Sequence, residues 1–208
     1  MTKASKQSAV ALVLTLLLLV VDQVIKILVK TNMEMHQQIV VTEWFRLLFT
    51  ENNGMAFGME LTPKIFLTTF RMIAIVFGIY YIARLIREKI SWGFLICLVG
   101  VLAGAIGNII DCMFYGLIFD APAYGVAHVV PWGEGYATFG HGRVVDMFYF
   151  PLVEWNWPTW MPWVGGEHFI FFSPIFNFAD ACISCGVIAI LLFYRNTFAK
   201  LLSTEKSA

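Results

Sequence analysis

Residues 10–29 read VALVLTLLLLVVDQVIKILV, an apolar run interrupted by Asp22 and Lys26, which are four residues apart. A helix of about 20 residues spans the roughly 30 Å hydrocarbon core of a bilayer, so this segment is long and apolar enough to cross a membrane. Lys3 and Lys6 precede it, as basic residues precede a secretory signal, but no small-x-small cleavage site follows it. We therefore expect this segment to remain attached as a membrane helix.

The composition of the chain agrees with a lipid environment. Hydrophobic residues make up 59% of the 208 residues and charged residues only 13%, against about 25% charged in ordinary soluble domains. The mean hydropathy is +0.75. The 14 basic and 14 acidic residues balance, so nothing in the charge favours nucleic acid as a partner. Four cysteines are too few for a disulfide scaffold, and we interpret them as packing residues.

Three further segments are long and apolar enough to cross a bilayer. The four predicted spans are residues 10–29, 65–86, 92–114 and 174–194, and the two outer loops are residues 30–64 and 115–173. Basic residues cluster at alternate ends of the spans, which places both termini in the cytoplasm by the positive-inside rule. The sequence thus predicts one all-α integral membrane domain over residues 1–208, with four transmembrane helices, a small periplasmic β-sheet and a long interfacial loop.

The two outer loops are expected to differ. Residues 38–50, QIVVTEWFRLLFT, are rich in β-branched and aromatic residues and predict a small β element before the turn signal Asn52-Asn53-Gly54. The second loop is rich in Trp, which prefers the headgroup level, so we expect it to lie on the membrane. At its end, Ser173 and Pro174 resemble an N-cap and a first helical residue, which predicts a helix start there.

The acidic residues of the predicted spans fall at one depth. Asp22 and Asp111 lie late in outward-running spans, and Asp180 lies early in the inward-running last span, so all three are expected in the outer leaflet. Asp146 belongs to a strand-like run in the second outer loop that can reach the same depth. Charges inside lipid cost about 2.5–3.5 kcal/mol each on insertion scales, so each acid needs a partner or a function.

Structural and functional interpretations of these acids compete. For Asp22 we favour an ion pair with Lys26, one helical turn away, that offsets the burial of both groups. Asp111 follows small residues that let helices approach closely, so helix packing and substrate contact both stay open. For Asp146 and Asp180, spacing alone leaves two unrelated hydrogen-bonded acids as an even alternative to a catalytic pair.

Five local motifs occur in one order over most of the chain. They are Asp22-Gln23-x-x-Lys26, Asn52-Asn53-Gly54-Met55-Ala56-Phe57, Gly104-Ala105-Ile106-Gly107-Asn108-Ile109-Ile110-Asp111, Val144-Val145-Asp146-Met147 and Phe176-Asn177-Phe178-Ala179-Asp180. In this order, on a four-helix topology, they resemble the signal peptidase II family of lipoprotein signal peptidases. The resemblance implies an aspartyl endopeptidase that removes the signal peptide from diacylglyceryl-modified prolipoproteins, cutting before the lipidated cysteine.

The resemblance also implies that Asp146 and Asp180 form the catalytic pair. Two carboxylates held about 3 Å apart cannot both ionise, so they share one proton. The ionised member can take a proton from the attacking water while the protonated member hydrogen bonds to the scissile carbonyl, which requires neither a metal nor another cofactor. The residues expected to bind substrate or to support the pair are Asn52, Gly54, Asn108, Asp111, Arg143, Asn177, Asp22 and Lys26. For each asparagine, helix or turn capping is an equally good interpretation.

The chain departs from the family pattern in three ways. The family usually has Arg after the Asp of its third motif, where this chain has Cys112, and Arg143 is one candidate substitute. Met55 replaces the first of the family's two alanines with a bulkier residue beside the expected binding groove, from which we expect a narrower choice of substrate. Asp146 is 35 residues from Asp111 and 34 from Asp180, intervals longer than the family norm, and the extra sequence is a candidate lid.

The resemblance further implies the partners and the location of the protein. The implied partners are lipidated prolipoproteins and membrane lipid. The implied location is the bacterial inner membrane, with the active site at its periplasmic face. We expect the protein to be a monomer. The main alternative is a small proton-coupled transporter that uses the same carboxylates. An inverted repeat is missing, and the acids gather at one depth instead of crossing the membrane, both of which argue against it. A zinc protease would need His-Glu-x-x-His, which Glu167-His168 does not continue.

Overall fold

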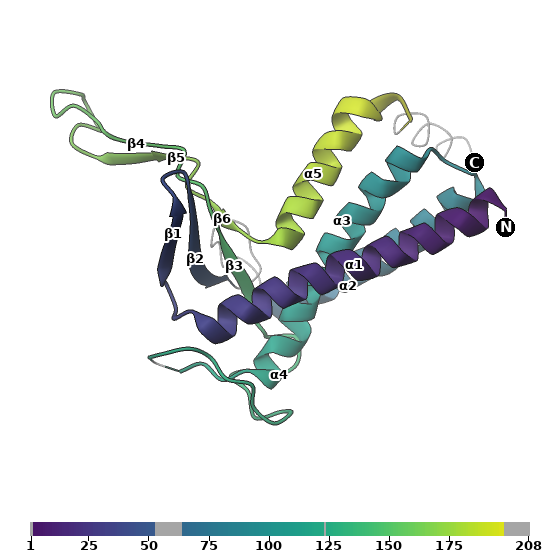
Figure 1. The fold of residues 1–208 in the computed structure, drawn as a ribbon, viewed down its shortest axis with the longest axis horizontal. Coiled ribbons are helices and arrows are strands. Elements are labelled where there is room, and N and C mark those ends of the chain that lie inside the picture. Colours follow the sequence, from purple (N-terminus) through teal and green to yellow (C-terminus); the bar gives the residue numbers. More distant parts are fainter. Residues whose placement is uncertain (1, 53–63, 123, 198–208) are drawn as a thin grey trace.

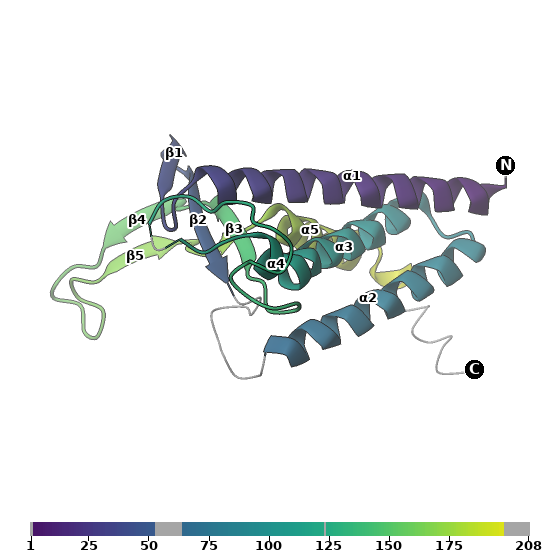
Figure 2. The ribbon, with the colours of Figure 1, turned by 90° about the horizontal axis from the view of Figure 1, so that it is seen from below.

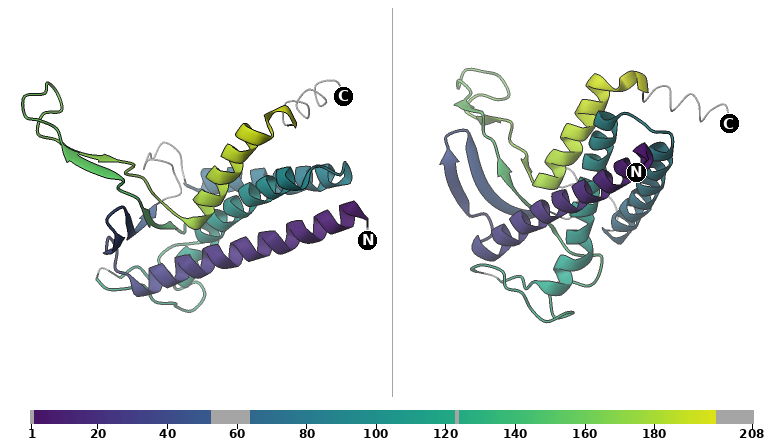
Figure 3. Two further views of the ribbon diagram at one scale, coloured as in Figure 1. Left: turned by 45° about the horizontal axis from the view of Figure 1, so that its top comes forward. Right: turned by 45° about the vertical axis from the view of Figure 1, so that its right-hand side comes forward.

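A bundle of apolar helices forms the body of the protein in the computed structural model, which describes residues 2–52, 64–122 and 124–197. Its long helices are α1 (Lys3–Asn32), α2 (Lys64–Arg87), α3 (Trp92–Ile110) and α5 (Phe178–Phe193). The start of α1, the end of α2 and the end of α5 lie at one end of the bundle, and the β strands lie at the other (Figures 1 and 3). The helices therefore alternate in direction along the chain.

Three stretches of the described chain are long and apolar enough to cross a membrane. They are Lys3–Asn32, Lys64–Arg87 and Trp92–Ile118. The last of these runs from α3 through a wide π-helical turn, η2 (Asp111–Tyr115), into α4 (Gly116–Ile118), beyond the predicted end at residue 114. The helix α5 is apolar but has only 16 residues. The prediction of a mostly helical membrane protein is confirmed.

These helices carry apolar side chains on their exposed faces as well as on the faces that pack in the core. Leu16 in α1, Val76 in α2 and Leu192 in α5 are 54%, 67% and 66% exposed. Such large apolar patches are costly in water but suit the hydrocarbon of a bilayer. The exposed surface of the bundle therefore faces lipid, and the polar residues buried inside it require partners within the protein.

A four-stranded sheet covers the end of the bundle where α1 ends and α5 begins. Its strands are β1 (Gln38–Thr42), β2 (Phe45–Asn52), β3 (Val144–Tyr149) and β6 (Ile175–Phe176), antiparallel in the order β1-β2-β3-β6. The β element predicted over residues 38–50 is confirmed as the β1–β2 hairpin. The register places Thr50 opposite Asp146 and Asn52 opposite Val144. The inner strand β3 thus carries Asp146, and the other inner strand, β2, brings Asn52 beside it.

A second hairpin, β4 (Val153–Asn156) with β5 (His168–Phe171), projects from the sheet away from the helices (Figures 1 and 2). Its connecting segment contains Trp160 and Trp163, which are 78% and 97% exposed. An ion pair of 3.0 Å between Arg46 of β2 and Glu154 of β4 ties this hairpin to the main sheet.

The start of the last helix was wrongly predicted. Ser173 and Pro174 do not begin a helix, because the next two residues form β6 against β3, which keeps the chain extended. The helix α5 begins at Phe178 with Asn177 as its N-cap. The Asn177 side chain accepts the Asp180 backbone N–H at 2.9 Å, and the Asp180 carboxylate accepts the Asn177 N–H at 3.3 Å. This reciprocal capping box fixes Asp180 in the first turn of α5.

Candidate active site

Asp146 and Asp180 come together at the junction of the sheet and the helices, and Asn177 contacts both of them. The Asn177 side-chain amide donates to Asp146 Oδ1 at 2.7 Å, while its backbone N–H donates to Asp180 Oδ2 at 3.3 Å. Asp146 is 3% exposed. The two acids, 34 residues apart in sequence, are therefore neighbours in space.

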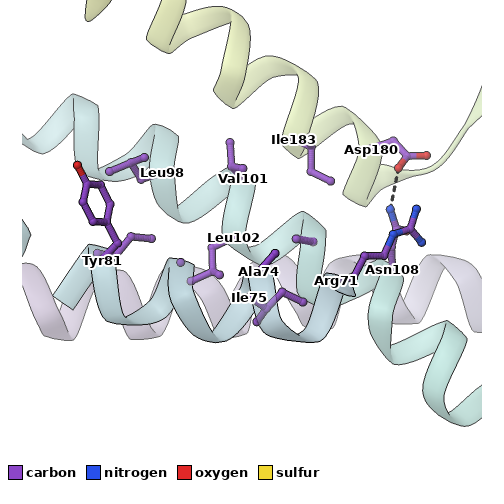
Figure 4. Close-up of a pocket in the computed structure, with 13 residues that line it drawn as sticks. Arg71, Ala74, Ile75, Tyr81, Leu98, Val101, Leu102, Asn108, Asp180 and Ile183 are labelled. Atoms are coloured by element: carbon purple, nitrogen blue, oxygen red, sulfur yellow. Dashed lines mark hydrogen bonds between the residues drawn. The ribbon is translucent and has the colours of Figure 1, made fainter. Parts of the chain in front are cut away.

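Two further asparagines donate to the same carboxylates. Asn108 of α3 donates from Nδ2 to Asp180 Oδ1 at 2.7 Å, the dashed line in Figure 4. Its Oδ1 accepts Lys26 Nζ at 2.9 Å and Asn177 Nδ2 at 3.1 Å, which orients the amide so that its N–H groups point toward Asp180. Asn52 Nδ2 donates to Asp146 Oδ2. The structure thus brings all three predicted asparagines to the acid pair.

The environment of Asp146 favours its protonated form. Burial raises the pKa of this carboxyl group, and the nearby charge of Asp180 raises it further, to about 7, against the opposing effect of the hydrogen bonds from Asn177 and Asn52. Two close carboxyl groups of which one keeps its proton near neutral pH are the arrangement that general acid and base catalysis by a pair requires.

Beneath the pair, Lys26 forms a buried ionic network. Its Nζ lies 3.0 Å from Asp22 Oδ2 and 2.9 Å from Asp111 Oδ2, and all three residues are at most 2% exposed. Asp22 Oδ1 accepts the backbone N–H of Ala179 at 3.0 Å, and Asp111 Oδ2 accepts that of Val145 at 3.3 Å. Asp22 and Asp111 therefore hold the backbone next to Asp180 and Asp146.

Gln23 is a member of this network that the sequence analysis did not propose for the site. Its amide donates to Asp111 Oδ1 at 3.0 Å and to Asp22 Oδ2 at 3.1 Å, and its Oε1 accepts the Tyr115 hydroxyl at 3.1 Å. Its place beside Asp22 in the first motif was the available signal. That signal does not say which side of the helix the amide faces.

Arg143 lies outside the acid pair. Its guanidinium is 3.4 Å from Glu51 Oε2 and stacks over the Tyr136 ring at 5.2 Å. Glu51 also forms an ion pair with Lys30. This group of charges surrounds the end of β2 and so holds the strand that presents Asn52. Gly54 and Met55, the other predicted residues of that motif, are outside the described residues.

A cavity of about 400 Å³ opens beside the pair, between α2, α3 and α5. Its walls are mainly aliphatic, with Asp180 and Asn108 at one end (Figure 4). Arg71 of α2 lies at the same end. This arginine was not among the residues predicted for the site, although a charged residue inside the predicted span 65–86 was a signal for it. In the described part of the chain, no three His, Cys, Asp or Glu side chains are grouped as metal ligands.

The fold and this site define a multi-pass membrane protein with a carboxylate pair, Asp146 buried and Asp180 half-buried, at the end of an apolar cavity. Residues 14–195 match the family model described as signal peptidase (SPase) II. The chain therefore belongs to the signal peptidase II family and is a membrane peptidase.

Similar proteins agree with this assignment. The lipoprotein signal peptidase of Porphyromonas gingivalis is 53% identical over 202 residues, covering 97% of this chain and 89% of the relative. That of Amoebophilus asiaticus is 38% identical over 193 residues, covering 88% of this chain and 76% of the relative. A solved bacterial membrane enzyme has the same fold, with a TM-score of 0.59 at 21% identity, covering 91% of this chain and 90% of the solved chain.

Proposed function

We propose that this protein is an aspartyl endopeptidase that removes the signal peptide from diacylglyceryl-modified prolipoproteins and cuts before the lipidated cysteine. Membership of the signal peptidase II family supports the removal of signal peptides from prolipoproteins. The observation that supports the aspartic mechanism is the double contact of Asn177, whose side-chain amide donates to Asp146 and whose backbone N–H donates to Asp180.

In this mechanism the pair shares one proton. The ionised carboxylate takes a proton from a water molecule as its oxygen attacks the scissile carbonyl carbon. The protonated carboxyl group hydrogen bonds to the carbonyl oxygen, and a proton from the pair passes to the leaving amine when the peptide bond breaks. Asn52, Asn108 and Asn177 hold the two carboxyl groups in place through the hydrogen bonds described above, and no metal takes part.

The position of the pair supports a substrate that is partly in the membrane. The cavity beside Asp180 is lined by aliphatic side chains of three helices, so it suits acyl chains or an apolar signal peptide. We propose that four helices cross the bacterial inner membrane, that both termini are cytoplasmic and that the site faces the periplasm. Lys3 at the start of α1, with Arg84 and Arg87 at the end of α2, agrees with this orientation by the positive-inside rule. The enzyme acts as a monomer in this proposal.

Replacing either acid tests the proposal. In detergent, we expect Asp146→Asn and Asp180→Asn each to reduce the cleavage rate of a diacylglyceryl-modified precursor peptide by about a hundredfold to ten-thousandfold. The reason is that each variant loses a proton-transfer group. Asp120→Asn is the matched control, since Asp120 contacts His128 in an outer loop and not the pair. The measurement is the initial rate by mass spectrometry, with a melting curve for each variant.

Three results would each contradict a part of this proposal. Full activity in the double Asn variant would remove the pair from the chemistry. Loss of activity with a chelator, restored by added zinc, would replace the aspartic mechanism with a metal-dependent one. Equal cleavage of a precursor without the diacylglyceryl group would contradict the lipidated substrate while leaving the acid pair in place.

A further inference from the structure

Arg71 is the charged residue within residues 65–83 of α2, a stretch that is otherwise mainly apolar. It lies in the second turn of α2, in a stretch that is long and hydrophobic enough to cross a membrane. An arginine in such a position is costly unless it serves a partner or a ligand. Its guanidinium lines the cavity at the end where Asp180 and Asn108 lie (Figure 4).

The packing of α2 fixes this end of the cavity next to the active site. Met72, the next residue, packs with Ile75 against a buried cluster that includes Cys112 of η2 and Val144 of β3. Val144 is two residues before Asp146 in the same strand. Arg71 therefore belongs to the turn of α2 that borders both the acid pair and the apolar space beside it.

Two other cations near the site form ion pairs with carboxylates that do not line the cavity. Lys26 pairs with Asp22 and Asp111, and Arg143 pairs with Glu51. Among the residues that line the cavity, Arg71 is the basic one. Its guanidinium carries five N–H donors in one plane, so it can contact protein groups and a ligand at the same time.

We propose that Arg71 is a substrate-binding residue that donates hydrogen bonds to carbonyl oxygens of the lipidated peptide as it enters the cavity between α2, α3 and α5. This inference rests on the proposed function. A lipidated precursor offers such carbonyls from two sources, the peptide backbone and the acyl esters of the diacylglyceryl group. In a cavity with aliphatic walls, a donor array at the end next to Asp180 supplies the polar contacts that hold the substrate there.

The experiment compares three variants of the full-length protein in detergent. Arg71→Met removes the donors but keeps an unbranched apolar chain, and Arg71→Lys keeps the charge but not the planar array. Arg84→Met is the matched control on the same helix, since Arg84 forms a 3.4 Å ion pair with Glu88 near the opposite end of α2. We expect Arg71→Met to raise KM for the lipidated peptide about tenfold to a hundredfold, the effect of losing hydrogen bonds to a charged group.

The division between KM and kcat distinguishes substrate binding from a structural role. If Arg71 binds substrate, kcat stays within about threefold of wild type and Arg71→Lys recovers part of the KM effect. If Arg71 serves only to hold Asp180 or the helices, kcat or the melting temperature falls and KM does not change, which overturns the inference. An Arg84→Met effect equal to that of Arg71→Met also overturns it.

A second substrate separates the two sources of carbonyl oxygen. A peptide with a dialkylglyceryl ether has no acyl carbonyls. If the KM effect of Arg71→Met disappears with this ether, Arg71 binds the acyl ester, and if the effect persists, Arg71 binds the peptide backbone. Failure of the wild type to cleave any lipidated peptide would reject the proposed function, whereas an unchanged KM in an active Arg71→Met enzyme would reject only the role of Arg71.

Discussion

The Asn177 side chain both caps α5 and holds the Asp146 carboxyl group. Its Oδ1 accepts the Asp180 N–H and so begins α5, and its Nδ2 donates to Asp146 at 2.7 Å. The residue that starts the helix is thus also the residue that fixes Asp146 relative to that helix. The capping interpretation of this asparagine is confirmed, and its role in catalysis, the equal alternative from sequence, stays a prediction.

The raised pKa of Asp146 predicts how activity depends on pH. Burial and the charge of Asp180 hold this pKa at about 7, so the pair keeps its shared proton below that value and loses it above. We expect kcat/KM for an uncharged lipidated substrate to fall as pH rises through about 7, because the protonated member is then lost. A profile that stays level up to about pH 9 would contradict this.

The same group should make folding stability depend on pH, which provides a second measurement. A carboxyl group whose pKa is raised in the folded state contributes stability that is complete below its ordinary pKa of 3.8 and is lost as pH rises through about 7. The melting temperature of the wild type should therefore fall relative to that of Asp146→Asn between about pH 4 and pH 7. A constant difference between the two proteins would mean that Asp146 titrates normally.

For single residues, the sequence predicted the polar members of the motifs but not all of the residues that lie beside them in the folded protein. Asp22, Lys26, Asn108 and Asn177 stand in recognisable motifs, and the structure groups them around the acid pair. Arg71 was not predicted because Asp180 and Asn108, which line the same end of the cavity, lie on other helices. The position of a residue along one helix does not say which face of that helix meets such neighbours.

Among the elements, the contact between α3 and α5 places Asn108 against Asp180. Gly104 lies one turn before Asn108, and a Cβ there would collide with the Ala179 carbonyl oxygen and lie 2.7 Å from Ile183 Cγ1. At Gly100, one turn further back, a Cβ would be 3.7 Å from the Cys182 carbonyl oxygen, an ordinary contact. One close approach of the two helices therefore lies at the turn next to the candidate site, and another lies at Gly186, where a Cβ would be 2.8 Å from the Cys97 carbonyl oxygen.

This difference predicts contrasting effects of one methyl group. Gly104→Ala should push α5 away and reduce activity about tenfold or more, since a displacement of about 1 Å in a catalytic group can cost a factor of about a hundred. Gly100→Ala should keep wild-type activity and a wild-type melting temperature. Both are measured by cleavage rate and thermal unfolding in detergent. Equal effects of the two substitutions would show that the spacing of the helices at Gly104 does not control the site.

The elements differed in how well the sequence predicted them. Long apolar helices follow from hydropathy, because lipid requires each backbone hydrogen bond to be made within the segment. The β1–β2 hairpin follows from local residue preference. The strand β6 does not, since two residues become a strand only through pairing with β3, and the sequence before α5 holds a misleading Ser-Pro signal. The β4–β5 hairpin was missed for the same reason, and its strands are only four residues each.

For the molecule as a whole, Lys26 is the point where separate parts meet. Through Asp22 and Asp111 it connects α1 with the first turn of α5 and with the strand β3, by way of the Ala179 and Val145 backbone N–H groups. Each of these parts contributes to the site, so the ion network holds the molecule in the arrangement that the acid pair needs.

Removing the ammonium group should therefore destabilise the entire protein. Lys26→Met leaves two buried carboxylates facing each other without a cation, which costs about 3–5 kcal/mol for a broken buried pair. We expect a much lower melting temperature in detergent. The triple variant Asp22→Asn, Lys26→Met and Asp111→Asn removes all three charges and should melt well above Lys26→Met. If the single and the triple variant melt together, loss of packing and not uncompensated charge is the cause.

The capping box of Asn177 and Asp180 has a consequence for biosynthesis. Asp180 stands on the last described helix, so strand β3 leaves the ribosome with Asp146 well before its counterpart exists. Until α5 docks on α3, Asp146 lacks both Asp180 and the hydrogen bond from Asn177. In the proposed mechanism, an unfinished or stalled product therefore cannot hydrolyse neighbouring proteins in the bilayer.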